Sequence, residues 1–269
     1  MIRFYPPRQL FRHFEIRRRL SKGGSFLEVG AGSLGLCQEM LQRFPQGTAV
    51  DFHQKVTHHY QRLDPTIRAR LALHIGDFMN LRLPGEYDCA VACEVLEHVE
   101  DDVAFLRRLL DLLRPGGQLI VSVPAHQRLW SNHDDSVGHL RRYERAELQT
   151  LMENAGLEQI QIIGYGYPFT NLLGWPRRWL AHYHQRSRAR WNQQRLTAAS
   201  GTEQALPSFR WLGLVANPVT VRPLAWLAAC FNHTDLSDGY LVFARWPDQR
   251  RGHNRPRSDG NCSRSTRRG

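Results

Sequence analysis

The sequence has few cysteines and no long uninterrupted apolar run. Its five cysteines among 269 residues show no paired metal-ligand spacing, which argues against a disulfide framework and favours a reducing, cytoplasmic location. Residues 1–7 lack the apolar run that opens a signal peptide. The apolar stretch 211–231 contains two prolines and Arg222, and a central arginine costs roughly 2.5 to 3.5 kcal/mol on membrane-insertion scales. That stretch is therefore a poor transmembrane helix, and a buried helical hairpin is the simpler interpretation.

Acidic side chains are unevenly distributed. Positive and negative side chains balance over residues 1–164, so the formal net charge of +11 arises from the rest of the chain. Residues 165–195 interleave aromatic side chains with arginines, and no acidic residue lies from 177 to 195. The arginines of this run are Arg177, Arg178, Arg186, Arg188, Arg190 and Arg195. Such a segment suits a cap over the protein's own acceptor pocket, an anionic membrane surface or single-stranded nucleic acid. Residues 248–269 are almost without apolar side chains and are expected to be a disordered basic tail.

A glycine-rich turn follows the first apolar strand, which is expected over residues 25–30. Gly30 and Gly32 let the backbone turn tightly and approach a ligand, and Gly35 lets the following helix pack close to the sheet. The spacing G-x-G-x-x-G is also that of dinucleotide sites, so a nicotinamide-dependent oxidoreductase is one alternative. Glu28 favours another ligand, because its carboxylate would repel a pyrophosphate but attract the ammonium and sulfonium groups of S-adenosylmethionine. The turn is therefore interpreted as a methyl-donor site.

Two further acidic residues follow the next strands. Asp51 ends the strand predicted over 47–51 and is placed to accept both ribose hydroxyls of the ligand, a role that dinucleotide folds share. Asp77 follows the strand predicted over 71–75 and is a candidate for the adenine amino group, with Phe78 offering a backbone amide. An aspartate that caps the next short helix is an equally good interpretation of Asp77.

Two later segments complete the pattern. Residues 87–99 read YDCAVACEVLEHV, and residues 112–124 read LLRPGGQLIVSVP. Together with the glycine turn and the two acidic strand ends, they resemble class I S-adenosylmethionine-dependent methyltransferases over residues 25–164, slightly more than half of the chain. The resemblance implies a cofactor site lined by Glu28, Gly30, Gly32, Asp51, Asp77 and Cys93.

Strands and helices alternate along the chain, which predicts a doubly wound, Rossmann-like α/β sheet. The first six predicted strands lie near residues 25–30, 47–51, 71–75, 87–92, 117–123 and 157–163, and residues 114–117 are expected to close a helix and start the fifth of them. In the resembled family an antiparallel seventh strand pairs with the sixth, and residues 239–246 have the pattern of that strand. The methyltransferase core is thus expected over residues 1–164, completed by the strand at 237–247. A helical insertion over 165–236 is expected to cover the acceptor pocket and set substrate choice.

A cluster of acidic and histidine residues lies where the fourth strand ends, at the edge where such sheets bind ligands. Its members are Glu94, Glu97 and His98, and the spacing E-x-x-E-H resembles the metal-binding motif of ubiquinone-pathway O-methyltransferases and small-RNA 2′-O-methyltransferases. A magnesium ion there would acidify an acceptor hydroxyl. The polar run 126–143 supplies His139 as a further base or ligand. Leu-Glu-His also occurs in the resembled family without a metal, in which case His98 orients the backbone or acts as a base.

The sequence therefore predicts an S-adenosylmethionine-dependent methyltransferase that acts on a small or lipid-like acceptor, with oxygen as the favoured acceptor atom. Glu97, His98 and His139 are the predicted catalytic residues. RNA or another nucleic acid is the alternative acceptor. A non-catalytic membrane-binding or nucleic-acid-binding protein on the same scaffold is the alternative function, and membrane contact would use residues 165–195.

Overall fold

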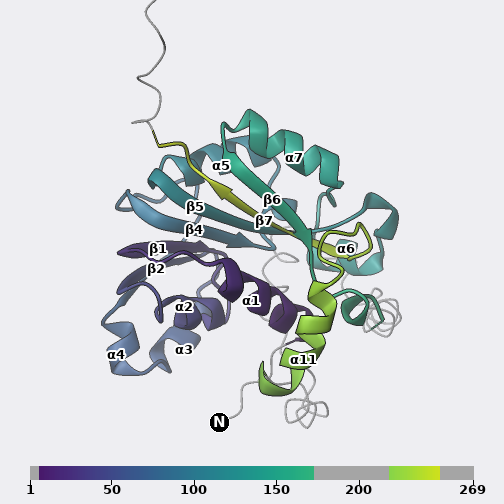
Figure 1. Ribbon diagram of the computed structural model, residues 1–269. Helices are drawn as coiled ribbons and strands as arrows, with labels where there is room; N and C mark the ends of the chain where they lie inside the picture. Colours follow the sequence, from purple (N-terminus) through teal and green to yellow (C-terminus); the bar gives the residue numbers. More distant parts are fainter. Residues whose placement is uncertain (1–5, 173–217, 249–269) are drawn as a thin grey trace, which may run out of the picture.

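Seven strands and the helices between them make up the computed structural model, which describes residues 6–172 and 218–248 (Figure 1). The strands are β1 (Ser25–Val29), β2 (Gln46–Asp51), β3 (Leu71–Ile75), β4 (Tyr87–Cys93), β5 (Leu113–Pro124), β6 (Glu158–Gly164) and β7 (Gly239–Arg245). They form one sheet in the order β3-β2-β1-β4-β5-β7-β6. Strands β1 to β5 pair in parallel, whereas β7 lies antiparallel between β5 and β6. The predicted Rossmann-like sheet with an antiparallel last strand is confirmed.

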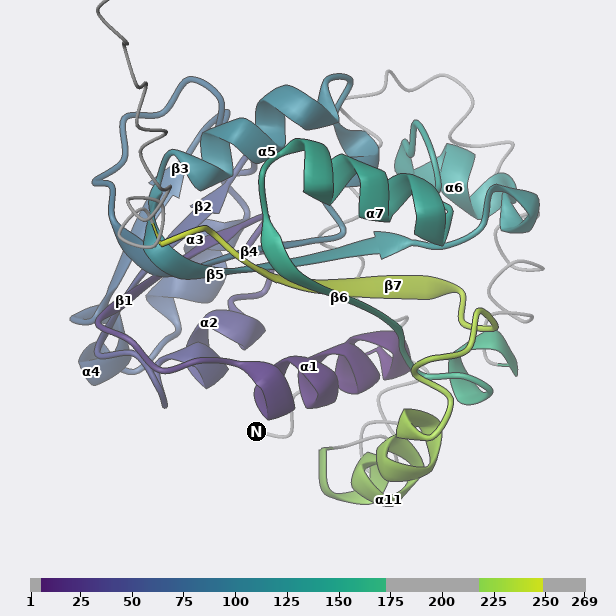
Figure 2. The ribbon, with the colours of Figure 1, turned by 45° about the horizontal axis from the view of Figure 1, so that its top comes forward.

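Helices cover both faces of this sheet. They are α1 (Pro7–Arg19), α2 (Gly35–Met40), α3 (Val56–Gln61), α4 (Pro65–Arg68), α5 (Asp102–Leu110), α6 (Asn132–Val137), α7 (Arg145–Asn154) and α11 (Pro218–Ala229). Figure 2 shows α5 and α7 on one face and α1 and α2 on the other, with α11 packed beside α1. Two short 3-10 turns, η1 (Leu96–His98) and η2 (Gln127–Leu129), follow the carboxyl ends of β4 and β5.

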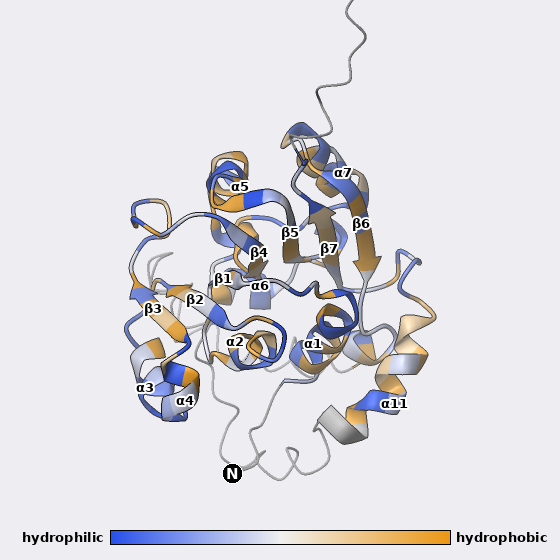
Figure 3. Cartoon of the chain, turned by 60° about the vertical axis from the view of Figure 1, so that its left-hand side comes forward, coloured by the Kyte–Doolittle hydropathy of each residue, from blue (hydrophilic) through white to orange (hydrophobic). Residues whose placement is uncertain are grey.

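The central strands are apolar on both sides because both faces of the sheet are covered. In β4, Cys89 and Val91 pack in the core cluster with α1 and α2, whereas Ala90 and Ala92 pack in the cluster with α5 and α7. Figure 3 shows largely apolar strands between helices of mixed polarity. The two cores hold the strands rigidly, so their carboxyl ends form a fixed edge for ligand binding.

Helix α1 was not predicted from the sequence. Leu10, Phe11 and Phe14 are among its buried residues, and they pack against the sheet face that α2 also covers. Pro7 occupies the first helical position, where its missing N–H has no helical partner to lose. Five of its thirteen residues are arginines, and they interrupt the helical spacing of apolar residues that would otherwise predict a helix.

Only the two ends of the predicted insertion 165–236 lie within the described residues. Its second end forms α11, whose Val221, Ala225 and Ala228 are buried in the core cluster shared with α1. Residues 173–217, which hold the arginine run, and residues 249–269 lie outside the described residues, so the helical cap and the basic tail stay predictions. Within the ranges 6–172 and 218–248, no helix is long and apolar enough to cross a membrane.

The fifth strand begins earlier than predicted. Leu113 already pairs with Tyr87, and the register then shifts before the regular ladder resumes at Gln118. Residues 114–117, predicted as the start of the strand after a turn, form its irregular first part, with Gly116 in the left-handed region at φ 77°. The carboxyl end of β5, which bears on the site, is unaffected.

Candidate active site

The glycine turn after β1 lies against the end of β2 at the carboxyl edge of the sheet. Gly30 and Gly32 have φ of 76° and 48°, and the Gly30 N–H donates a hydrogen bond to the Val50 carbonyl at 2.9 Å. Asp51 accepts hydrogen bonds from the backbone N–H of Gly32 at 2.7 Å and of His53 at 2.8 Å. One bond reaches each carboxylate oxygen, so each oxygen keeps lone-pair capacity for a ribose hydroxyl.

Glu28 lies in β1 with only 3% of its surface exposed. The Cys37 thiol donates a hydrogen bond to its Oε2 atom at 2.7 Å. Burial raises the pKa of Glu28 to about 7, although the bond from Cys37 opposes this change. An ammonium group placed beside this carboxyl would favour its ionised form. A buried carboxyl and a carboxylate with free lone pairs at this edge are compatible with the aminoacyl and ribose contacts predicted from the sequence, and those contacts stay predictions.

We expect the affinity for S-adenosylhomocysteine to depend on pH through Glu28. Below a pH of about 7 the free protein holds Glu28 as the neutral acid, so binding of the ligand's ammonium group must release a proton. Affinity should rise from about pH 6 to about pH 8, by up to about tenfold, and then level off. Isothermal titration calorimetry in buffers of different ionisation enthalpy measures both the affinity and the released protons. Glu28→Gln should flatten the profile, whereas Glu153→Gln, an exposed change on α7, should preserve it. A flat wild-type profile would contradict the assignment.

The other predicted cofactor residues lie at the ends of β3 and β4. Asp77 is exposed and accepts hydrogen bonds from the Met79 N–H at 3.0 Å and the Asn80 side chain at 2.6 Å. These bonds begin a turn, and no helix lies in the described residues between β3 and β4, so Asp77 does not cap a helix. Phe78 is buried in the core cluster that contains α5. Burial raises the pKa of Cys93, the last residue of β4, to about 11, so this thiol is neutral. The predicted adenine contacts of Asp77 and Phe78, and the place of Cys93 in the cofactor site, stay predictions.

The two glutamates of the E-x-x-E-H motif have different surroundings. Glu94 follows β4 with φ of 56°, and its carboxylate oxygens lie 3.3 Å from guanidinium nitrogens of Arg8 and Arg12 in α1. Burial alone would raise the pKa of Glu94, but these two arginines hold it well below its usual range. Glu97 is fully buried, and neither of its carboxylate oxygens has a hydrogen-bond partner. Burial and the neighbouring charge of Glu94 raise the pKa of Glu97.

Glu97, His98 and His139 converge at this edge, although His139 comes from the loop after α6. Atoms that each residue offers as a metal ligand lie within 4.8 Å of one another. The His139 Nε2 atom is 3.7 Å from Glu97 Oε1, and the two imidazole rings meet edge to face with centroids 4.8 Å apart. Such a group is able to hold a divalent cation or to accept a proton from a bound hydroxyl. The structure thus brings the three predicted catalytic residues together, whereas Glu94 is paired with arginines.

Sequence reasoning missed the side chains that reach this site from α1 and from the end of β6. Arg8 and Arg12 pair with Glu94, and Arg8 Nε also donates a hydrogen bond to the Tyr165 hydroxyl at 2.9 Å. These residues carry no motif, and they become neighbours only when α1 packs across the sheet. Their separation along the chain explains why no local pattern pointed to them.

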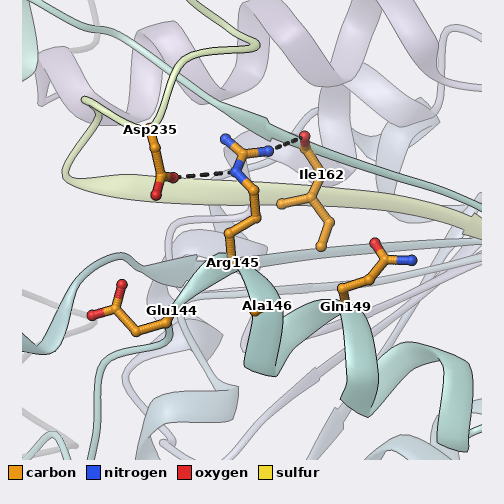
Figure 4. Close-up of a pocket in the computed structure, with 6 residues that line it drawn as sticks. All are labelled: Glu144, Arg145, Ala146, Gln149, Ile162 and Asp235. Carbon is orange, nitrogen blue, oxygen red and sulfur yellow. Dashed lines mark hydrogen bonds and ion pairs between the residues drawn. The ribbon is translucent and has the colours of Figure 1, made fainter.

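A hollow of about 510 Å³ lies beside the start of α7 (Figure 4). Its lining residues are Glu144, Arg145, Ala146, Gln149, Ile162 and Asp235. Arg145 crosses it, since its Nε donates to Asp235 at 3.1 Å and its Nη1 donates to the Ile162 carbonyl at 2.7 Å. None of the predicted site residues lines this hollow, and these bonds of Arg145 tie α7 to β6 and to the segment before β7.

The strand order, the glycine turn after β1 and the acidic residues in β1 and β2 define a class I fold of S-adenosylmethionine-dependent methyltransferases. A protein-family model described as a methyltransferase domain matches residues 3–162. The chain belongs to this methyltransferase family. The predicted family is therefore confirmed, and the nicotinamide-dependent alternative loses its support.

Individual relatives agree with the family. The chain is 32% identical over 108 residues to the mitochondrial ubiquinone biosynthesis O-methyltransferase of Schizosaccharomyces pombe, a match that covers 39% of each chain. It is 28% identical over 162 residues to a probable S-adenosylmethionine-dependent methyltransferase of Mycolicibacterium smegmatis, which covers 57% of this chain and 60% of the relative. The chain thus spans 39% and 60% of the length of these two curated relatives.

A solved structure shows the same fold. Phosphoethanolamine N-methyltransferase 2 of Haemonchus contortus, in complex with phosphomonomethylethanolamine and S-adenosylhomocysteine, superposes with a TM-score of 0.53. It is 16% identical, and the match covers 88% of this chain and 52% of that one. Because this neighbour is named for methylation at nitrogen, the shared fold does not decide the acceptor atom.

Proposed function

We propose that this chain transfers a methyl group from S-adenosylmethionine to a hydroxyl oxygen of a small or lipid-like acceptor. The observation that carries the proposal is the convergence of Glu97, His98 and His139 at the sheet edge that also bears Glu28 and Asp51. A proton-accepting cluster beside a methyl-donor site suits an oxygen nucleophile, which must lose its proton as it is methylated. The similarity to a ubiquinone biosynthesis O-methyltransferase supports oxygen as the acceptor atom.

The residues of the site have separate tasks in this proposal. S-adenosylmethionine, when bound, supplies a methyl group that its sulfonium makes electrophilic. Glu28 would hold the ammonium group of the ligand and Asp51 its ribose hydroxyls, and together they would orient the ligand. His139 accepts the hydroxyl proton at Nε2 while the oxygen–carbon bond forms and the carbon–sulfur bond breaks, its electron pair staying on sulfur. The pKa of Glu97 is raised, which favours its neutral form. A neutral Glu97 adds no negative charge beside His139.

Methyl transfer from isotopically labelled S-adenosylmethionine tests the proposal. Purified protein should label a lipid extract or a simple phenolic acceptor such as catechol, and mass spectrometry should locate the label on oxygen. Transfer to RNA alone would favour the nucleic-acid alternative. Binding of S-adenosylhomocysteine without transfer to any fraction would favour the non-catalytic alternative.

A second part of the proposal is a divalent cation bound by Glu97, His98 and His139. The buried carboxyl oxygens of Glu97 have no hydrogen-bond partner. Buried polar groups normally have partners, and a bound cation would supply one here. Two imidazoles and a carboxylate suit magnesium less well than manganese or zinc, because imidazole is a softer ligand than the oxygen ligands that magnesium prefers. The ion would lower the pKa of a bound acceptor hydroxyl.

Removal of metal tests this second feature. If the site holds an ion that the reaction needs, EDTA should lower transfer by at least about tenfold, and added Mg²⁺ or Mn²⁺ should restore it. The electron paramagnetic resonance signal of Mn²⁺ reports binding independently of activity, and Glu97→Gln should abolish that binding. Full activity in EDTA together with no Mn²⁺ binding would leave His139 as a metal-free proton acceptor.

A further inference from the structure

We infer that Asp134 is a positioning residue for His139, because its carboxylate holds the imidazole with a proton on Nδ1 and so leaves Nε2 as the proton-accepting or metal-binding atom. The inference rests on the proposed role of His139 in methyl transfer and names the residue that sets the state of its ring. Asp134 lies in α6 and is fully buried. Its Oδ1 atom is 2.8 Å from His139 Nδ1.

Both oxygens of Asp134 face hydrogen-bond donors, which is the environment of an ionised carboxylate. Its Oδ1 accepts from Arg142 Nε at 2.9 Å, and its Oδ2 accepts from Arg142 Nη2 at 3.0 Å. The backbone N–H and the hydroxyl of Ser131 also donate to Oδ2, at 2.8 and 3.0 Å. An ionised carboxylate only accepts hydrogen bonds, so the facing nitrogen of His139 must carry a proton.

This arrangement selects one tautomer of the neutral ring. With hydrogen on Nδ1, the lone pair resides on Nε2, the atom that lies 3.7 Å from Glu97 Oε1. A proton acceptor and a metal ligand both need that lone pair. The opposite tautomer would place an N–H there and block both roles.

The carboxylate is itself fixed to the sheet. Arg142 Nη1 donates to the carbonyl of Ala125 just after β5, at 3.0 Å, and Ser131 and Asp134 form the capping box that begins α6. The N–H of His139 also donates to the Asp134 carbonyl, at 3.0 Å. The polar run 126–143 therefore buries an ion pair that ties the loop bearing His139 to the end of β5.

Asp134→Asn distinguishes a positioning role from a merely structural one. Asparagine keeps the size of the side chain and one acceptor oxygen, but its NH₂ group must then face donors of Arg142 or His139. With the NH₂ group at the Oδ1 position, moving the His139 proton to Nε2 relieves the clash with His139, because Nδ1 then accepts a hydrogen bond from the asparagine. Arg142 Nε loses its acceptor there, while Arg142 Nη2 keeps the asparagine oxygen as its partner. A wrong tautomer in a carboxylate–histidine pair removes the base function, which is worth about 10²- to 10⁴-fold in rate.

Nuclear magnetic resonance of ¹⁵N-histidine-labelled protein tests the tautomer directly, with His139→Gln used to assign the signal. Neutral His139 should carry its proton on Nδ1 in the wild type and on Nε2 in Asp134→Asn. Asp135→Asn makes the same chemical change on the next residue of α6, where the side chain is exposed, and should leave the spectrum unchanged. In transfer assays Asp134→Asn should lower kcat by about 10²-fold or more, with KM and the Kd of S-adenosylhomocysteine within about threefold. Asp134→Glu, which restores the carboxylate, should recover part of kcat.

The outcomes separate this inference from the proposed function. A wild-type His139 with its proton on Nε2 would overturn the inference, even if Asp134→Asn does not fold. An unchanged tautomer in a folded Asp134→Asn, or equal losses of kcat in Asp134→Asn and Asp135→Asn, would overturn it as well. If the wild type transfers no methyl group to any acceptor, the proposed function fails, while the spectrum still decides whether Asp134 sets the tautomer.

Discussion

His139→Gln should lower the kcat of methyl transfer by about 10²- to 10⁴-fold, the usual contribution of a positioned proton acceptor. Glutamine keeps a polar side chain of similar reach but has no basic nitrogen to take the hydroxyl proton. The affinity for S-adenosylhomocysteine should stay near the wild-type value, because Glu28 and Asp51 lie in β1 and β2. Assays with labelled donor give kcat, and calorimetry gives the Kd of the donor product.

His58→Gln is the matched control for this prediction, since His58 is exposed on α3, and its kcat should equal that of the wild type. The two possible roles of His139 then differ in what restores activity. If His139 is the base, the loss should shrink at alkaline pH, where a phenolic acceptor ionises without help. If His139 is a metal ligand, excess Mg²⁺ or Mn²⁺ should recover part of the rate. Wild-type kcat in His139→Gln would remove the residue from the mechanism.

Most of the sheet could be predicted because strands buried on both faces are short apolar runs. The predicted ranges for β1 to β4, and the range 239–246 for β7, agree with the structure to within one residue at each end. The start of β5 could not be predicted in the same way, because Gly116 and Gly117 are typical of a turn, whereas Leu113 already pairs with Tyr87. Helix α1 escaped prediction because its arginines interrupt the apolar pattern, and their partners lie elsewhere in the chain.

In the site, too, positions set by the local sequence could be predicted, whereas contacts between distant segments could not. Glu28, Gly30 and Asp51 could be proposed as site residues from sequence, since each lies at or near the end of its own strand. Glu94 and Glu97 look equivalent in the E-x-x-E-H motif, but the positive φ of Glu94 and the 3-10 turn after it lead the two carboxylates to different partners. Arginines of α1 hold the first, whereas the second lies near His139.

Asp51→Ala should weaken the binding of S-adenosylhomocysteine by about 100-fold or more. Hydrogen bonds to a charged group contribute roughly 1.5 to 3 kcal/mol each, and the proposed site has two ribose hydroxyls facing this carboxylate. A loss of about 3 kcal/mol corresponds to about 100-fold in Kd at 25 °C. The N–H groups of Gly32 and His53 would also lose their acceptor, which loosens the glycine turn. Calorimetric titration measures the change.

Two further variants separate lost recognition from lost structure. Asp51→Asn keeps an acceptor oxygen for the Gly32 N–H but carries no charge, so its affinity should fall by about tenfold, between those of the wild type and Asp51→Ala. Asp64→Ala removes a similar cap, from the Thr66 N–H at 2.8 Å in α4, and should leave the Kd unchanged. Wild-type affinity in Asp51→Ala would place the ribose elsewhere. Because dinucleotide sites share a ribose-binding carboxylate, NAD is titrated alongside. A wild type that binds the donor product but not NAD, and loses the former in Asp51→Ala, ties this carboxylate to the methyl donor.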